Sequence, residues 1–171
     1  MINSQLYTWL KKQKKKQKLK VTKVNLNSLK DWKFNKKEIF HKSKRFFKII
    51  GVRIKSNFYK KNWDQPIISQ NEIGILGIIK NSKTNKYLLQ AKAEPGNINK
   101  IQISPTVQAT KSNYTRVHGG KEIPYLRFFK KKNKNFSLQF DQAFRYYNKL
   151  KSNIVSLISK KLKLQKSFRW F

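Results

Sequence analysis

The sequence predicts one domain of the α+β class, and two features of its apolar patterning lead to that prediction. Four segments between residues 46 and 93 are rich in β-branched and aromatic side chains, with turn residues between them, as in strands. Residues 142–171 lack acidic residues, glycine and proline, and their apolar residues recur at helical spacing. A length of 171 residues fits a single domain with its own core.

Two segments precede the predicted strands. Residues 1–22 are expected to form a polar, basic arm, in which Tyr7, Trp9 and Leu10 would seed a short helix. Residues 24–34 are expected to dock on the domain and then form another short helix. Ser28 would cap that helix and Asp31 would favour its first turn.

The strands are predicted from runs of apolar residues bounded by turns. They are residues 46–54, with a bend at Gly51, then 63–70, 72–80 and 86–93. The third is almost continuously apolar, so burial on both faces is expected. It should form a hairpin with the fourth, which ends at a turn over residues 94–97.

Two further helices are predicted after the hairpin. Residues 101–103 should be short and extended, and Ser104 and Pro105 are expected to open a helix as its cap and first residue. The spacing of Ile154, Leu157, Ile158 and Leu162 predicts a basic amphipathic helix at the C-terminal end.

The charge balance is strongly basic, because 41 Lys and Arg against 7 Asp and Glu give a net charge of +34. Such a balance is typical of proteins that bind nucleic acid or an anionic membrane surface. The basic residues are concentrated before residue 62 and after residue 129, and the centre is nearly ordinary. A codon bias toward Lys, Asn and Ile in an AT-rich genome explains the excess equally well.

Cysteine is absent, which excludes a disulfide framework, a thiolate nucleophile and a zinc–cysteine site. The absence is compatible with a reducing compartment, so a cytoplasmic protein is expected. No apolar run approaches the ~20 residues of a membrane-spanning helix. No apolar region follows the basic residues near the start of the sequence, so a secretory signal is not expected. His41 and His118 lie far apart among few carboxylates, so no metal site is predicted.

One polar cluster lies on a predicted strand. Gln90, Lys92 and Glu94 alternate with two alanines, so the three polar side chains share one face. They would form either the wall of a site or a solvent-facing strand with an internal ion pair, worth about 0–1 kcal/mol. Taken alone, the second interpretation is favoured.

A second polar cluster combines hydroxyls, amides and two cations. It consists of Gln108, Thr110, Lys111, Ser112, Asn113, Tyr114 and Arg116. Such groups suit a phosphate or sugar ligand, and a turn-rich capped loop is the alternative. Trp32 and Trp63 are candidates to stack on a base or sugar, although a role in the core is favoured for either one alone.

Three long, contiguous strings in the centre are distinctive enough to indicate a protein family. They are QPIISQNEIGILGI from Gln65, QAKAEPGN from Gln90 and SPTVQATKSNYTRVHGG from Ser104. Together with the preceding segment they closely resemble the NDP-hexose 2,3-dehydratases of deoxysugar biosynthesis over about residues 24–129. The resemblance implies a Nudix-like fold, a mixed sheet between helices, without the Nudix metal-binding box, which this sequence also lacks.

The resemblance also implies a reaction, on a dTDP-4-keto-6-deoxyhexose and without a cofactor. The C4 ketone acidifies the C3 proton, a base removes it, and the C2 hydroxyl leaves from the enolate with help from a general acid. The enol product then tautomerises to a 3,4-diketo-2,6-dideoxy sugar.

The resemblance implies that Trp32 and residues 110–114 contact the nucleotide sugar. Lys111 and Arg116 are the candidates for the diphosphate, and Gln108 belongs to the same binding set. The candidates for proton transfer are Glu94, Tyr114 and His118, with base and acid left open.

Family members carry two copies of this unit, and this chain resembles the N-terminal copy. The predicted boundaries are a basic arm over 1–22, a dehydratase-like unit over 23–141 and a basic amphipathic tail over 142–171. After Asp141 and Gln142 the sequence departs from the family pattern, which predicts an incomplete pocket wall, and a frameshifted tail is one hypothesis.

The expected partners are the dTDP-sugar and either a second copy of the chain or a chain carrying the second repeat; nucleic acid is not expected. Whether one unit catalyses alone is left open. The alternatives are an inactive remnant and a basic protein for nucleic acid or an anionic surface, whose binding would weaken steeply with salt.

Overall fold

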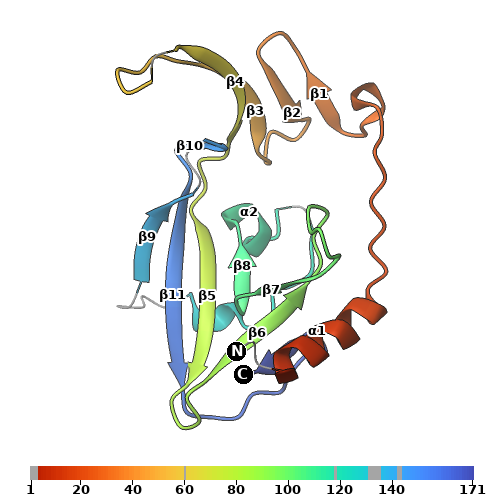
Figure 1. Cartoon of the computed structure of the whole chain (residues 1–171), viewed down its shortest axis with the longest axis vertical. Helices are drawn as coiled ribbons and strands as arrows, with labels where there is room; N and C mark the ends of the chain where they lie inside the picture. The colour runs from red at the N-terminus through yellow and green to blue at the C-terminus, as the bar shows by residue number, and fades with distance from the viewer. Residues whose placement is uncertain (1–3, 60, 118, 131–135, 142–143) are drawn as a thin grey trace.

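The computed structural model describes residues 4–59, 61–117, 119–130, 136–141 and 144–171. Within these residues the regular structure is mostly strand, with two α-helices, so a mixed α and β fold is confirmed. The strands form two sheets (Figure 1). Sheet A has the order β1-β2-β3-β4-β10, and sheet B has the order β12-β6-β5-β11-β9, with β7 on β6 and β8 on β5.

The N-terminal residues form a docked helix. Helix α1, Ser4–Lys16, buries Trp9, whose ring centroid lies 5.2 Å from that of Phe171. Ala91 and Ile101 complete this small core cluster. The short helix expected near Trp9 is therefore confirmed, and it runs further than predicted. Helix α1 lies beside the C-terminal residues of the chain (Figure 1).

Sheet A contains two predicted strands and three unpredicted ones. Its strands are β1 Trp32–Phe34, β2 Glu38–His41, β3 Lys48–Ile54, β4 Trp63–Ser69 and β10 Tyr146–Tyr147. β3 pairs with β4 without interruption through Gly51 and Pro66, so Gly51 lies inside a continuous strand and the bend expected there stays a prediction.

The helix predicted after Ser28 is wrong. Only a 3₁₀ turn, Leu26–Ser28, forms there, and the Ser28 hydroxyl donates to the Asn25 carbonyl instead of capping a helix. Asp31 lies at φ 66°, which ends any helical path, and the chain continues as β1. The antiparallel pairing of β1 with β2 outweighs the weak local helix signal.

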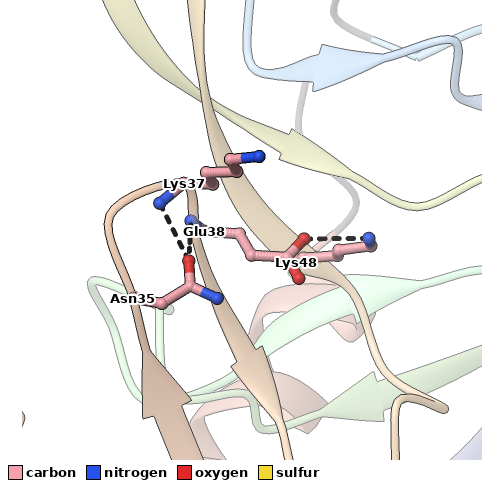
Figure 2. Close-up of polar contacts among 4 residues, drawn as sticks. All are labelled: Asn35, Lys37, Glu38 and Lys48. Atoms are coloured by element: carbon pink, nitrogen blue, oxygen red, sulfur yellow. Dashed lines mark hydrogen bonds and ion pairs between the residues drawn. The ribbon is translucent and has the colours of Figure 1, made fainter.

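A side-chain turn joins β1 to β2 (Figure 2). Asn35 Oδ1 accepts hydrogen bonds from the backbone N–H groups of Lys37 and Glu38, at 2.8 and 3.0 Å. The Glu38 carboxylate then pairs with Lys48 Nζ at 2.9 Å, which links β2 to β3.

Sheet B carries the main core. Its longer strands are β5 Gly74–Asn81, β6 Lys86–Lys92, β9 Phe136–Phe140 and β11 Leu150–Ile158, and its shorter ones are β7 Gln102–Ser104, β8 Val107–Ala109 and β12 Phe168–Trp170. The β5–β6 hairpin is confirmed. Gly77 on β5 packs directly under the Phe129 ring, and a Cβ there would lie 2.5 Å from that ring.

The predicted C-terminal helix is also wrong, because its apolar centre is strand β11. This strand lies between β5, to which it is parallel, and β9. Ile154, Ser156 and Ile158 are buried whereas Val155 and Leu157 are exposed, which is the alternation of a strand. A short apolar run fits both periods, and here the two neighbouring strands decide the outcome.

Thr106 lies where strand β5 changes its pairing partner. The last residues of β5 pair with β6, and its earlier residues pair with β8. The Thr106 hydroxyl accepts a hydrogen bond from the Ile79 N–H at 3.0 Å and donates to the Leu88 carbonyl. Ser104 and Pro105 therefore connect two short strands and do not open a helix. The next helix, α2 Lys111–Tyr114, begins after Thr110, and a 3₁₀ turn follows at Leu126–Phe128.

Candidate functional site

Three hollows surround β8 and α2. The central hollow, of about 180 Å³, is lined by Gln70, Gly74, Ile75, Leu76, Lys92, Glu94, Gln108, Ala109, Thr110, Asn113, Asp141, Tyr146, Lys149 and Lys151. The motif hollow, of about 350 Å³, is lined by Gln90, Lys92, Thr106, Val107, Gln108, Ser112, Asn113, Arg116 and residues 120–124. The basic hollow, of about 630 Å³, is lined by Lys44, Arg45, Phe46, Lys48, residues 69–73, Lys111 and Tyr114.

Two ion pairs contribute to the central hollow. Lys92 Nζ lies 2.7 Å from Glu94 Oε1, at the end of β6. Lys151 Nζ lies 2.7 Å from Asp141 Oδ2, where β9 and β11 adjoin. The pair expected within the polar face of β6 is therefore present, and it also lines a hollow.

Lys149 is the most buried cation of this hollow. Its residue is only 3% exposed, and its Nζ donates a hydrogen bond of 2.7 Å to the backbone carbonyl of Glu72. Burial lowers the pKa of the Lys149 ammonium, and the negative charges of Glu72 and Asp141 oppose that shift. A buried lysine with a depressed pKa in a polar hollow is a candidate functional group.

Helix α2 is fixed to the start of β5 by Glu72. The Glu72 carboxylate accepts hydrogen bonds from the backbone N–H of Ser112 at 3.2 Å and from the Ser112 hydroxyl at 3.0 Å. Thr110 Oγ1 lies 3.1 Å from the same hydroxyl. The contacts of Ser112 hold the helix in place, and they leave Thr110 and Asn113 lining the central hollow.

The structure separates the two cations predicted to hold a diphosphate. Arg116 lines the motif hollow, where its Nε donates to the Gly120 carbonyl at 3.0 Å. Lys111 lines the basic hollow together with Tyr114. Gln108 lines both the central and the motif hollow and accepts a hydrogen bond from the Ser104 hydroxyl at 3.0 Å.

The three candidates for proton transfer are not brought together in one hollow. Glu94 lines the central hollow, whereas Tyr114 lines the basic hollow and packs against the core. His118 lies outside the described residues.

Trp32 lies in an aromatic cluster on sheet A and lines none of the three hollows. Its ring centroid is 5.0 Å from that of Phe47 and 6.1 Å from that of Phe46, which lines the basic hollow. Trp63 lies on β4, where its indole N–H donates to Gln65. Neither tryptophan meets the polar residues of α2 in these contacts.

The last described segments, residues 136–141 and 144–171, supply residues that sequence reasoning missed. Asp141, Tyr146, Lys149 and Lys151 all line the central hollow, in the region where the sequence predicted an incomplete wall. One feature of the sequence could have indicated them. Lys149 and Lys151 are two residues apart, just before the β-branched residues of β11, which fits the start of a strand.

The described residues contain no candidate metal cluster and no candidate membrane-spanning helix. No group of three or more His, Cys, Asp or Glu side chains is arranged to hold a metal ion in this part of the chain. Among the described helices, none has the length and apolar character required to cross a membrane.

Comparison with known proteins decides the family. The sequence model of the family described as NDP-hexose 2,3-dehydratase matches residues 3–171. The chain belongs to the NDP-hexose 2,3-dehydratase family. The match extends through the N-terminal helix and through β11 and β12 to Phe171, whereas the resemblance seen in the sequence covers about residues 24–129. A frameshifted tail would not be expected to continue a family match or to supply a central strand.

Three curated relatives are each named dTDP-4-dehydro-6-deoxy-alpha-D-glucopyranose 2,3-dehydratase. The protein of Saccharopolyspora spinosa is 33% identical over 176 residues, which cover 98% of this chain and 36% of the relative. That of Streptomyces violaceoruber is 34% identical over 174 residues, covering 96% and 39%. That of Amycolatopsis orientalis is 43% identical over 99 residues, covering 53% and 21%. In the first two, the chain thus spans 36% and 39% of the relative's length.

Proposed function

We propose that this chain is a nucleotide-sugar 2,3-dehydratase unit that acts on a dTDP-4-keto-6-deoxyhexose. The observation that carries the proposal is the extent of the family match, residues 3–171. It includes the motif residues and the tail residues that together line the central hollow. The names of the relatives support the same substrate class and the same elimination.

The sizes of the hollows suggest how the substrate is divided between them. The central hollow, of about 180 Å³, is smaller than the roughly 300–1,000 Å³ of most small-molecule sites. It therefore suits the hexose and not the whole nucleotide sugar. The motif hollow shares three lining residues with it, Lys92, Gln108 and Asn113, whereas the basic hollow shares only Gln70.

The nucleotide end is accordingly assigned to the motif hollow. Arg116 and Lys121 line it and supply the positive charge that a diphosphate requires. Thr110 and Asn113 then face the sugar from the central hollow. In this arrangement Lys111, in the basic hollow, has no contact with the diphosphate.

Glu94 and Lys149 are the groups in the central hollow best suited to the chemistry. Glu94 removes the C3 proton, and the electron pair moves toward the C4 oxygen as an enolate forms. The Lys149 ammonium, whose hydrogen bond to the Glu72 carbonyl uses one of its three donors, stabilises the developing negative charge. The C4 carbonyl then re-forms and a C2=C3 double bond appears as the C2 hydroxyl leaves. It leaves as water with the proton that Glu94 took from C3, and the resulting C3 enol tautomerises to the ketone.

The proposal has two further parts, one on the fold and one on the location. We assign a Nudix-like arrangement to sheet B, and a solved structure in which β5 and β11 are not neighbouring parallel strands would contradict it. We assign a cytoplasmic location, consistent with a sequence that lacks cysteine. Fractionation of the source cells would test that location.

The reaction is tested by proton NMR in D₂O with the 4-keto-6-deoxyhexose linked to dTDP. The expected result is exchange of the C3 hydrogen for deuterium, followed by loss of the C2 hydroxyl. The matched control is the corresponding dTDP-sugar with a C4 hydroxyl, which should show neither change because its C3 hydrogen is not acidic. No exchange, together with polyanion binding that weakens steeply with salt, would favour the alternative of a basic binding protein.

The placement of the nucleotide is tested by calorimetry with dTDP. Arg116→Gln should weaken binding by about tenfold, because it removes a charge-assisted contact. Lys111→Gln is the matched control, since it removes the same charge from the neighbouring hollow and should leave the affinity unchanged. Equal losses in the two variants would contradict the placement.

A further inference from the structure

Strand β9, Phe136–Phe140, lies at the outer edge of sheet B (Figure 1). All five of its residues are exposed, and Phe136, Leu138 and Phe140 are 56%, 51% and 77% exposed. One edge of the strand pairs with β11, and no strand of the described chain pairs with its other edge. Proteins usually protect such edges with charged residues, but this strand has none although the chain carries a net charge of +34.

The open edge offers a regular set of backbone groups. The Asp141 N–H donates to the Lys149 carbonyl at 2.8 Å, so the backbone of Asp141 points toward the β11 side. In an antiparallel ladder the direction alternates at each residue, so Ser137 and Gln139 also point toward β11. Phe136, Leu138 and Phe140 therefore direct their N–H and C=O groups outward.

The sequence of the strand is complementary to itself. Phe-Ser-Leu-Gln-Phe alternates apolar and polar residues and has the same pattern in both directions. If two copies pair antiparallel about a twofold axis at Leu138, Phe136 lies opposite the partner's Phe140 and Leu138 lies opposite the partner's Leu138. The polar pair is Ser137 with the partner's Gln139, so every cross-strand pair matches in character.

We propose that β9 is the surface through which two copies of this chain pair, joining their B sheets about a twofold axis at Leu138. A twofold interface uses the same patch on both partners, as this self-complementary strand permits. The absence of charge on β9 matters because two chains of +34 repel wherever their lysines approach each other.

The pairing should be weak and should strengthen with salt. A five-residue strand pair falls below the ~1,200–2,000 Å² that stable interfaces bury, so dissociation constants of about 10–100 µM are expected. Added salt screens the repulsion between the two basic chains and leaves the apolar and backbone contacts in place. This salt response is opposite to that of polyanion binding.

Pairing at β9 would also steady the central hollow. Asp141 directly follows β9 and pairs with Lys151, and both line that hollow. A partner strand at the open edge would fix the strand that ends beside this ion pair. The proposal itself rests on the strand and does not depend on the proposed reaction.

Cysteine cross-linking tests the register directly, because the chain has no cysteine of its own. Leu138→Cys should form a disulfide-linked dimer under mild oxidation, since paired residues on antiparallel strands lie within the ~4.4–6.8 Å between Cα atoms that a disulfide spans. Ser137→Cys alone should not, but a mixture of Ser137→Cys and Gln139→Cys should. Ile98→Cys, at a position 92% exposed in a loop, is the control for random collision.

Sedimentation velocity of the unmodified chain completes the test. The dimer fraction should rise between about 0.05 and 0.5 M salt, and Leu138→Lys should abolish it by placing two like charges face to face. A chain that stays monomeric up to about 300 µM at both salt concentrations would overturn the proposal. So would cross-linking of Leu138→Cys no faster than that of Ile98→Cys, which would leave the edge to a different partner.

Discussion

The central segment, residues 63–129, and the tail, residues 136–171, both line the central hollow, but the sequence reveals them very unequally. The central segment contributes Glu94 and Asn113 from strings that resemble the family closely. The tail contributes Asp141 and Lys149 from a stretch with no such string, although the family match includes both. Many sequences can form a strand that is held mainly by backbone pairing. The residue types of such a strand therefore predict its position in the sheet poorly.

The largest expected effect separates a strand from a helix in the tail. Ile154 is 8% exposed and faces the core, whereas Leu157 is 59% exposed. Ile154→Asp should cost more than about 3 kcal/mol or prevent folding, because it buries an unpaired charge. Leu157→Asp should change stability by less than about 1 kcal/mol, as measured by chemical denaturation. In a helix the two positions would share a face, so equal losses would contradict the strand.

The central segment has its own sensitive point at Thr106, whose hydroxyl bonds to Ile79 and Leu88. Thr106→Val keeps the shape but leaves two buried backbone groups without partners, so unfolding free energy should fall by about 2–4 kcal/mol. Thr106→Ser retains the hydroxyl and should cost less than about 1.5 kcal/mol. If the serine variant were the less stable of the two, packing and not hydrogen bonding would explain the site.

A smaller effect is expected at Gly77, where the central segment packs under the Phe129 ring. Gly77→Ala should cost about 1–3 kcal/mol, because the new methyl group would lie 2.5 Å from a ring atom. The same change made in a Phe129→Leu background should cost less, since the smaller side chain yields. Additive losses in the double-mutant cycle would show that the two residues do not crowd each other.

The smallest effect concerns the tail lysine and its pH dependence. The pKa of Lys149 is lower in the folded chain than in the unfolded chain, so the unfolded chain binds more protons between the two values. The penalty for burying the charge is full below the folded pKa and disappears as pH rises through the ordinary lysine pKa of about 10.4. Relative to Lys149→Met, the wild-type chain should therefore gain stability as pH rises from about 8 toward that value. A difference that is constant or falls with pH would contradict the shift.

Strands with strong β-branched patterns were predictable from sequence. The positions of β3, β4 and the β5–β6 hairpin follow from runs such as Ile49–Ile50 and Ile78–Ile79 between turn residues. β11 was not predictable from its period, because Ile154 and Ile158 fit a helix as well as a strand. β1 and β2 are too short to give a clear local signal in the sequence. Their stability comes from antiparallel pairing, of β1 with β2 and of β2 with β3.

The residues of the candidate site also differ in how well the sequence predicts them. Glu94, Gln108 and Asn113 were predictable because they belong to recognisable strings, and all three line the central hollow. Lys149 was not, because in the sequence it is one basic residue among 41 and only burial distinguishes it. A side chain whose importance depends on the fold around it gives no signal in composition.

The most direct test of the proposed site is the rate of C3 hydrogen exchange in the 4-keto-6-deoxyhexose of the dTDP-sugar. This rate is compared among the wild-type chain, Glu94→Gln and Lys149→Met. Both variants should lose at least about a hundredfold in exchange rate, because one removes the base and the other the enolate partner. Both should bind dTDP as the wild type does, since neither residue lines the motif hollow. Exchange at the wild-type rate in Lys149→Met would contradict the central claim that the tail completes the site.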